Sequence, residues 1–381
     1  MPPTHCTLVW YPSSGGHLHQ LYTGFLMLHK RGLIGLAQQR SKQPLTASAA
    51  EHLKNIDGAH LSVVVNGSIR VHYDCHDAVE LNERQLEDCD FYFKRSFSGR
   101  HLENYPRHRN KVFPLGLYYR VFPDTLDLQS IRRALVASSG LMGRLRALLD
   151  FVDSRNVLKY NPRVRHFESL PAYRLPPKVL FLAAVHDPYS RADRSREKIE
   201  EMTAINDTRA KCIQVLRKEL GPAFLGGIIR NAYAVKSYKA SLVQDSEMTR
   251  KRRYVGLLRS FPICIATTGL HGSIGGKFGE YVALSKAIVS ERLNYEVPGE
   301  LQPGRNYLEF VSPEQCAEQC IRLIEDRDER HRLMLNNALY YQSHLRADSL
   351  VLNSLLKVLS ASYAAPEMPL RAVPQKVRAY A

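Results

Sequence analysis

Residues 261–310 read FPICIATTGLHGSIGGKFGEYVALSKAIVSERLNYEVPGELQPGRNYLEF, and this stretch decides the fold. The apolar run over 263–266 is typical of a buried strand, and a turn rich in glycine and serine follows it. A short helix comes next, and then a second apolar strand over 287–290 with Glu291 at its end. The order strand, loop, helix, strand is the repeating unit of a parallel α/β sheet.

The loop and the first turn of this helix are suited to bind a phosphate and a sugar. Glycines let the backbone approach an anion, and a helix N-terminus offers unpaired N–H groups and the positive end of its dipole. A lysine adds charge in the first turn, and a glutamate one turn later can accept a hydrogen bond from a sugar hydroxyl. The alternative is a tight turn followed by a solvated Lys–Glu pair. The candidate donor-binding residues are His271, Gly272, Ser273, Gly275, Gly276, Lys277 and Glu280.

Length and charge narrow the class of protein. A chain of 381 residues favours two domains, and 44% hydrophobic with 24% charged residues is typical of a soluble protein. The net charge is 53 − 37 = +16, which favours anionic partners such as phosphorylated small molecules or acidic lipids. The sequence contains no recognised nucleic-acid-binding module, so nucleic acid is not expected as a partner.

Cysteine usage and hydropathy indicate the compartment. The seven cysteines are odd in number and scattered, and several stand in apolar runs, as buried reduced thiols do. Cys316 and Cys320 lie four apart without a second ligand pair, so no metal site is expected there. No secretory signal pattern and no apolar run as long as a membrane span occur, which predicts a cytoplasmic protein.

The N-terminal half shows the pattern of an α/β domain with an antiparallel element. A strand over 7–11 leads through a Ser-Ser-Gly-Gly turn into a helix whose apolar positions start at Leu18, and a second apolar run covers 33–37. Runs at 61–65 and 69–73 flank Asn66-Gly67, the strongest short hairpin signal. A helix over 83–87 and strands over 91–93 and 111–115 follow.

The pattern restarts after a proline-containing boundary. Prolines at 162, 171, 176 and 177 separate the halves, and a buried strand is expected over 178–184. We expect a second strand over 224–228 and helices over 193–220, 252–260, 314–325, 330–342 and 349–361. The predicted division is 1–175, 176–345 and a terminal helix with a basic tail, 346–381. Two doubly wound, Rossmann-like domains would face a central cleft, with ligands at the carboxyl ends of their strands.

The run from Ile263 through Ala338 resembles the C-terminal half of group 1 glycosyltransferases with the GT-B fold. The segments GGKFGEYVALSKAIVS and NYLEFVSPEQCAEQCIRLIEDRDERHRLMLNNA carry the resemblance. It implies a C-terminal domain that binds a nucleoside-diphosphate sugar and an N-terminal domain that binds the acceptor. Glu280 would then hydrogen-bond the ribose, and Lys277 with the N–H groups of Gly275 and Gly276 would face the diphosphate. Many retaining members carry another glutamate where this chain has Gly272, so the stereochemical outcome stays open.

Further candidates lie in the N-terminal half. Asp74, His76 and Asp77 stand at a strand end, where a general base for an inverting transfer would be placed, and His19 follows the glycine turn. The alternative for the cluster is a turn with local hydrogen bonds. A second group could contact phosphate or the acceptor, or form a solvated basic loop. Its members are Lys94, Arg95, Gly15 and Gly16.

Two patterns bear on metal and membrane. The Asp88-Cys89-Asp90 triplet precedes a strand instead of following one, so we expect no obligatory divalent metal and no cofactor other than the donor substrate. The arginine-rich amphipathic stretch 128–149 could lie on an anionic membrane surface, or form a core-facing helix with a basic outer face.

The sequence therefore predicts a glycosyltransferase that moves a sugar from a nucleoside-diphosphate sugar to an acceptor hydroxyl. The expected acceptor is a glycan, a lipid-linked or envelope molecule, or a secondary metabolite. The alternatives are a nucleotide-sugar epimerase or hydrolase on the same fold, and a non-catalytic protein that binds a nucleotide sugar or an anionic surface.

Overall fold

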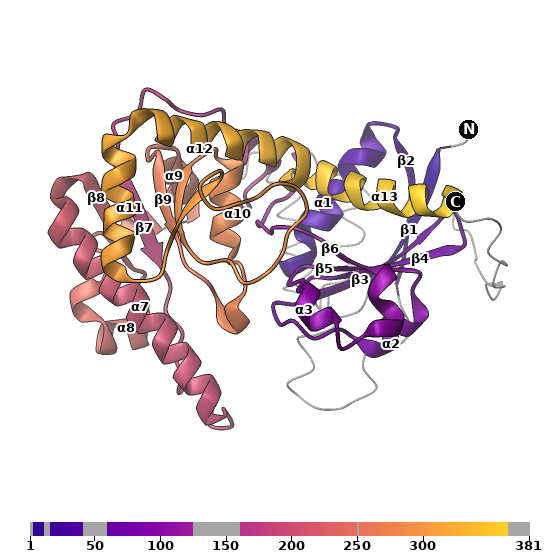
Figure 1. Ribbon diagram of the computed structural model, residues 1–381, viewed down its shortest axis with the longest axis horizontal. Helices are drawn as coiled ribbons and strands as arrows, with labels where there is room; N and C mark the ends of the chain where they lie inside the picture. Colours follow the sequence, from indigo (N-terminus) through magenta and orange to yellow (C-terminus); the bar gives the residue numbers. More distant parts are fainter. Residues whose placement is uncertain (1–2, 11–15, 41–58, 125–160, 250, 365–381) are drawn as a thin grey trace, which may run out of the picture.

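The computed structural model describes residues 3–10, 16–40, 59–124, 161–249 and 251–364, which form two α/β domains side by side (Figure 1). The expected fold class, two Rossmann-like domains, is confirmed. Residues 13–15 of the expected turn 13–16 and the whole basic stretch 128–149 lie outside the described residues.

The N-terminal domain is built on a six-stranded mixed sheet in the order β2-β1-β3-β4-β5-β6. Strand β3 runs antiparallel to both of its neighbours, and the other pairs are parallel, so the expected antiparallel element is confirmed. The strands are β1 (Thr4–Trp10), β2 (Ile34–Arg40), β3 (His60–Val65), β4 (Ile69–Asp74), β5 (Phe91–Lys94) and β6 (Val112–Pro114).

The turn between β3 and β4 is the hairpin that the sequence predicts. Asn66 and Gly67 both have positive φ, 51° and 78°, as the central residues of a type I′ turn do, and the Ser68 N–H donates to the Val65 carbonyl at 3.2 Å. Ser68 adds a third residue to the loop before β4 begins. The turn pairs Val65 with Ile69 and fixes the register of the hairpin through His60 and Asp74. The register thereby sets which side chains of β4 lie at the carboxyl end of the sheet.

Helices cover both faces of this sheet. One core contains residues of β1, β3 and β5 together with α1 (His19–Lys30) and α13 (Ala347–Ala364). A smaller core on the other face involves α2 (Glu83–Asp88) and α3 (Gly99–Leu102). Helix α13 comes from the end of the described chain, yet it packs along α1 in the N-terminal domain (Figure 1).

The C-terminal domain has a five-stranded parallel sheet in the order β11-β10-β9-β7-β8. Its strands are β7 (Val179–Ala183), β8 (Phe224–Ile228), β9 (Ile263–Ala266), β10 (Ala287–Glu291) and β11 (Tyr307–Phe310). Its main helices are α7 (Arg196–Leu220), α8 (Ala232–Ser237), α9 (Lys251–Arg259), α10 (Gly276–Ala283), α11 (Pro313–Glu325) and α12 (Arg327–Tyr340). The direction of winding reverses between β7 and β9, and the ligand crevice of such sheets lies at this reversal.

Caps set the helix boundaries and explain where they differ from expectation. The helix expected from 193 begins at Arg196, because the Ser195 hydroxyl accepts a hydrogen bond from the Lys198 N–H at 3.3 Å. The helix expected from 330 begins at Arg327, because the Asp326 carboxylate caps the Glu329 N–H at 2.8 Å.

Among the described residues, no helix is long and apolar enough to cross a membrane.

Candidate functional site

Helix α7 holds the loops at the carboxyl edge of the C-terminal sheet. The buried Arg209 guanidinium donates to the carbonyls of Ala184 and Thr268, each at 2.8 Å, and to the Thr267 hydroxyl at 3.0 Å. These groups belong to the loops after β7 and β9, the two strands that flank the reversal. Glu291, at the end of β10, accepts from the Thr268 N–H at 2.6 Å. The loops are thus fixed before any ligand binds.

The loop between β9 and α10, residues 267–275, contains most of the predicted donor-binding residues and is called the donor loop; its backbone conformation is unusual. His271 and Gly272 have positive φ, 59° and 64°. The Glu201 carboxylate of α7 accepts the His271 N–H, and the Tyr295 hydroxyl donates to the His271 carbonyl at 2.6 Å. Ser273, which is buried, accepts the Gly269 N–H through its carbonyl at 2.8 Å and closes the loop on itself.

Lys277 and Glu280 lie on the first turns of α10, and both are partly buried. The Lys277 ammonium contacts the carbonyl of Leu182 in β7, so its charge lies at the reversal between β7 and β9. Burial lowers the pKa of Lys277 to about 8, although the Glu280 carboxylate opposes this shift. Glu280 accepts a 2.7 Å hydrogen bond from the Tyr254 hydroxyl, and burial raises the pKa of its carboxyl.

The glycines of this segment have different functions. Gly275 is the N-cap of α10 and supplies no capping side chain. At Gly276 a Cβ would lie 3.2 Å from the Tyr118 ring, and at Gly279 it would lie 2.1 Å from the Tyr118 carbonyl. These two glycines let α10 pack directly on the chain that leaves β6. Close helix packing therefore accounts for Gly276 and Gly279 without a phosphate.

The N-terminal domain meets the donor loop at the ends of β4 and β5. A small cavity at this junction is lined from the N-terminal side by Asp77, Arg95 and Tyr118, and from the C-terminal side by Ile274 and Tyr295. The rings of His76 and His271 face each other across the junction with centroids 6.5 Å apart. The Gly99 N–H donates to the Glu296 carboxylate at 2.8 Å and ties the two domains beside the cavity.

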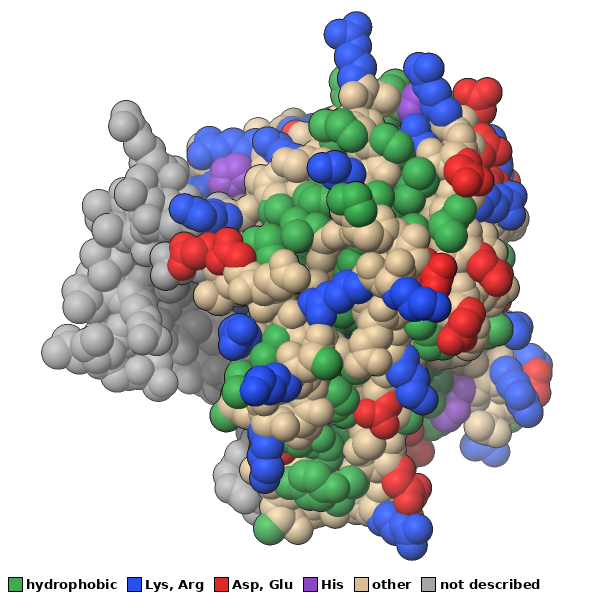
Figure 2. Space-filling view, turned by 90° about the vertical axis from the view of Figure 1, so that its left-hand side faces the viewer, with side chains coloured by type: hydrophobic (Ala, Val, Ile, Leu, Met, Phe, Trp, Pro, Cys, Tyr) green, Lys and Arg blue, Asp and Glu red, His purple; other side chains and the backbone are tan. Residues whose placement is uncertain are grey.

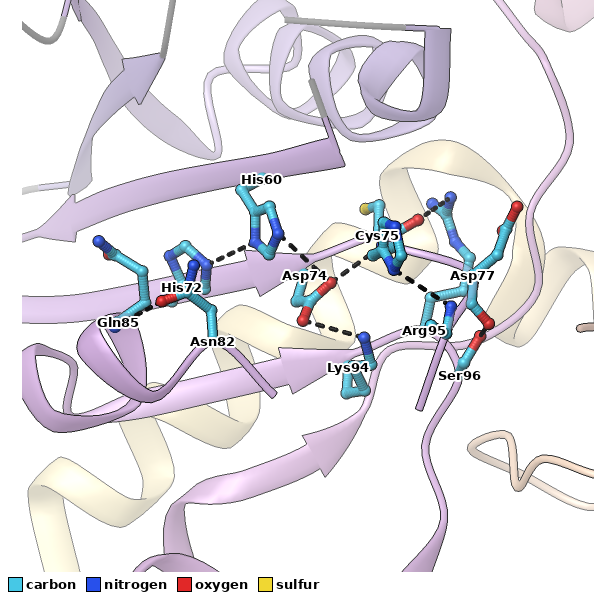
Figure 3. A network of polar contacts seen from close by, with 12 residues as sticks. His60, His72, Asp74, Cys75, Asp77, Asn82, Gln85, Lys94, Arg95 and Ser96 are labelled. Atoms are coloured by element: carbon cyan, nitrogen blue, oxygen red, sulfur yellow. Dashed lines mark hydrogen bonds and ion pairs between the residues drawn. The ribbon is translucent and has the colours of Figure 1, made fainter. Parts of the chain in front are cut away.

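Asp74 and Lys94 do not lie on the surface of this cavity. Each side chain is 1% exposed, and the Lys94 ammonium contacts the Asp74 carboxylate at 3.0 Å (Figure 3). Burial alone would raise the pKa of Asp74, but Lys94, His60 and the Tyr92 hydroxyl hold it below its usual range. Neither side chain is accessible to a substrate. The predicted roles, a base at Asp74 and an acceptor contact at Lys94, are therefore corrected: the two residues form a buried ion pair.

The buried pair anchors the loop that does reach the cavity. Asp74 accepts the His76 N–H at 2.9 Å, and the Ser96 hydroxyl donates to the Asp77 carbonyl at 2.7 Å. These bonds fix the loop after β4 against the loop after β5. Burial lowers the pKa of the half-buried His76, and Lys94 adds to this effect. His76 is therefore largely neutral at neutral pH and can accept a proton.

A pair of buried histidines extends the network away from the cavity (Figure 3). His60 Nδ1 lies 3.0 Å from His72 Nε2, and His60 Nε2 lies 3.9 Å from the Asp74 carboxylate. Burial lowers the pKa of both imidazoles, that of His72 well below its usual value.

The remaining N-terminal candidates are dispersed. The His19 ring packs against Phe122 in a tilted arrangement with centroids 4.3 Å apart, and His19 is not among the residues that line the cavity. The Gly16 carbonyl accepts a 2.8 Å hydrogen bond from the Tyr118 hydroxyl. Gly15 lies outside the described residues. The structure thus brings Asp77, His76 and Arg95 to the junction and leaves His19 apart from them.

Sequence reasoning missed Arg209, Tyr118 and Glu201, which shape the site. A signal existed for Arg209, because it shares a helix face with the buried Met202, Ile213 and Leu216, where an arginine is buried only with partners. Tyr118 gives no local signal, because it contacts α10 only through the tertiary fold.

Two further features of the described residues are the charged side chains on one end face and the cysteine thiols. Figure 2 shows the end face of the C-terminal domain, where Lys and Arg side chains are spread among Asp and Glu. All seven cysteines are buried free thiols. Within the ranges that the structure describes, no three His, Cys, Asp or Glu side chains are placed to hold a metal ion.

No family model and no curated protein matches the chain. Among solved structures, it is similar to the C-terminal domain of a glycosyl transferase group 1 family protein, LpcC from Francisella tularensis, at 12% identity over 47% of this chain and 95% of that chain, with a TM-score of 0.30. It is also similar to HepE from Anabaena in complex with UDP, at 11% identity over 93% of this chain and 99% of that chain, with a TM-score of 0.41. A third similar structure is a putative UDP-N-acetylglucosamine 2-epimerase from Listeria monocytogenes, at 9% identity over 96% of this chain and 77% of that chain, with a TM-score of 0.38. The function is therefore argued from the geometry of the site.

Proposed function

We propose that the protein transfers a sugar from a nucleoside-diphosphate sugar to an acceptor hydroxyl at the junction of its two domains. One observation carries the proposal: the donor loop, the α10 N-terminus and the Lys277 charge all lie at the strand-order reversal between β7 and β9. Nucleotides bind at this position in doubly wound sheets, with phosphate at a helix N-terminus. The sequence resemblance of residues 263–338 to group 1 glycosyltransferases supports the same role for this segment.

The proposed roles follow from position. The N–H groups at the start of α10 and the Lys277 ammonium would stabilise the leaving diphosphate, a role that needs no resident metal ion. Glu280 would accept a hydrogen bond from the ribose. Asp77 and His76, on the opposite side of the junction, are the groups available to take a proton from the acceptor hydroxyl if the reaction inverts. The N-terminal domain would then bind the acceptor, which would reach Asp77 and His76 from the junction.

Nucleotide binding tests the donor site directly. UDP, GDP and ADP would be screened by thermal shift and titrated by calorimetry into the wild type and Glu280→Gln. We expect one nucleotide to stabilise the protein, and the substitution to weaken its binding by roughly 1–3 kcal/mol, the scale of a lost hydrogen bond to a charged group.

A control separates this effect from damage to the packing of α10. Glu280→Gln also disturbs the hydrogen bond with Tyr254, so Tyr254→Phe removes that bond alone. Nucleotide affinity should survive in Tyr254→Phe. Equal losses in both variants would assign Glu280 to helix packing, and the absence of any nucleotide binding would refute the donor site. With the donor sugar present, release of nucleoside diphosphate only upon addition of acceptor distinguishes a transferase from an epimerase or a hydrolase.

A further inference from the structure

Arg95 is a buried cation without a neutralising partner. Its side chain is 7% exposed, yet no carboxylate of the described residues lies within 4.0 Å of it. Its Nη1 and Nη2 donate long hydrogen bonds to the Cys75 and His17 carbonyls, at 3.4 and 3.3 Å. Its Nε makes no hydrogen bond. A buried guanidinium with an unused donor is costly unless an anion completes its coordination.

The side chains around Arg95 form a candidate anion-binding site, which we call the seat. The guanidinium carbon lies 4.4 Å from the centroid of the Tyr118 ring, a cation–π contact that holds the guanidinium against this ring. The His17 imidazole stacks on the same ring at 5.9 Å, and its Nδ1 is buried without a hydrogen-bond partner. Burial lowers the pKa of His17, so this ring is largely neutral and one of its nitrogens is a donor. The Arg95 Nε and the His17 Nδ1, both without a hydrogen-bond partner, thus belong to side chains that contact the same tyrosine ring.

The location assigns the seat to the acceptor side. Arg95 follows β5 of the N-terminal domain, whereas Lys277 and the α10 N-terminus belong to the C-terminal sheet. The cavity that Arg95 lines also contains Asp77, the candidate base, and is closed by Ile274 of the donor loop. A ligand could donate a hydrogen bond from a hydroxyl to the Asp77 carboxylate and place an anionic group on the Arg95 guanidinium. Such a ligand would satisfy both charged side chains of the cavity.

We propose that Arg95 binds an anionic group, a phosphate or a carboxylate, of the acceptor, so that the acceptor is an acidic molecule. This inference rests on the proposed function, because it places the acceptor opposite the donor loop. A planar guanidinium forms paired hydrogen bonds with either group, so the chemistry of the seat is shared by both.

Anion titrations test the seat without knowledge of the acceptor. Inorganic phosphate and acetate would be titrated separately by calorimetry into the wild type, Arg95→Gln and the exposed control Arg109→Gln, which removes the same charge. We expect Arg95→Gln to weaken binding of at least one anion by about ten- to a hundredfold, as for loss of a charge-assisted hydrogen bond. Arg109→Gln should bind as the wild type does. The anion that binds more tightly identifies the acidic group as phosphate or carboxylate.

Three outcomes would overturn the inference. Equal affinities in Arg95→Gln and the wild type, or no anion binding by the wild type, would exclude the seat. Displacement of the bound anion by a nucleoside diphosphate, together with weaker nucleotide binding in Arg95→Gln, would assign Arg95 to the donor diphosphate.

If Arg95→Gln does not fold, Arg95→Lys decides, because lysine keeps the charge and lacks Nε. An unchanged anion affinity in Arg95→Lys refutes the proposed contact. Nucleotide binding to Glu280→Gln is read separately, so failure of the donor site and failure of the Arg95 seat remain distinguishable.

Discussion

At the residue scale, burial rather than residue type separates the groups that reach the site from those that support it. Asp74, His76 and Asp77 lie within four consecutive residues, yet Asp74 is 1% exposed in an ion pair with Lys94. Its carboxylate binds the His76 N–H and so fixes the loop that carries Asp77. Removal of one partner of such a pair leaves a buried charge unpaired, and this is costly even where the pair itself adds little stability.

The buried histidine pair makes stability depend on pH. Burial lowers the pKa of His72 and His60 in the folded state, while in the unfolded chain each titrates near 6.5. Below about pH 6.5 the unfolded state binds more protons, so the free energy of unfolding falls as the pH falls, by up to about 1.4 kcal/mol per pH unit for each histidine.

His72→Asn should remove one of these contributions and flatten the pH dependence of stability. Urea unfolding followed by circular dichroism between pH 5 and 7 measures the slope for the variant and the wild type. His5→Asn, at an exposed position, serves as the control and should keep the wild-type slope. An unchanged slope in His72→Asn would show that His72 takes up no proton on unfolding.

At the element scale, helix α10 depends on close packing as much as on its ligand-binding end. Its glycines at 276 and 279 face the Tyr118 backbone and ring, and Phe278 between them is buried in the core. The same helix start was expected to approach phosphate through its glycines. Gly275, the N-cap, has no such packing contact. A Cβ there would lie 3.5 Å from the Thr267 carbonyl oxygen, which is an ordinary van der Waals distance.

Gly279→Ala should destabilise the protein by about 1–3 kcal/mol, the usual effect of overpacking, because the new Cβ would lie 2.1 Å from the Tyr118 carbonyl. Gly256→Ala is the matched control in α9, where a Cβ meets nothing within 4 Å. This control should stabilise the protein by about 0.5–1 kcal/mol, because alanine has the higher helix propensity. The free energies of unfolding in urea check both, and a neutral Gly279→Ala would contradict the packing role.

At the scale of the whole molecule, the two domains are tied together by the C-terminal helix. The buried residues Leu350, Val351, Leu355 and Val358 of α13 belong to the core of the N-terminal domain. At Gly24 of α1 a Cβ would lie 2.1 Å from the Ala347 carbonyl, so the two helices pack in close contact. The Arg31 guanidinium contacts the Asp348 carboxylate at 2.8 Å at the same crossing. The N-terminal domain is therefore completed by residues from the other end of the chain.

Leu355→Ala should destabilise the N-terminal domain by about 2–5 kcal/mol, since it removes a buried side chain from the α1–α13 interface. Leu356→Ala, at a position that is 54% exposed on the same helix, should change stability by no more than about 0.5 kcal/mol. Hydrogen exchange would locate the effect: amides of β1, β3 and α1 should exchange faster in Leu355→Ala, and those of the C-terminal sheet should not. Faster exchange confined to the C-terminal sheet would contradict this domain assignment.

The sequence by itself determined most of the elements and their order. Apolar runs, the Asn66-Gly67 turn and the restart after the prolines located most strands and helices, because these features depend on side chains close together in the chain. The chemistry of the donor loop was also readable, since its residues are consecutive.

Only the tertiary structure decided which of these residues meet. It separated Asp74 from Asp77, turned Lys277 toward Leu182, and placed α13 on the N-terminal domain. It also left Arg95 buried and without an ion-pair partner among the described residues. The physical reason is that burial and long-range contacts depend on how separate elements pack, and local sequence patterns do not specify that packing.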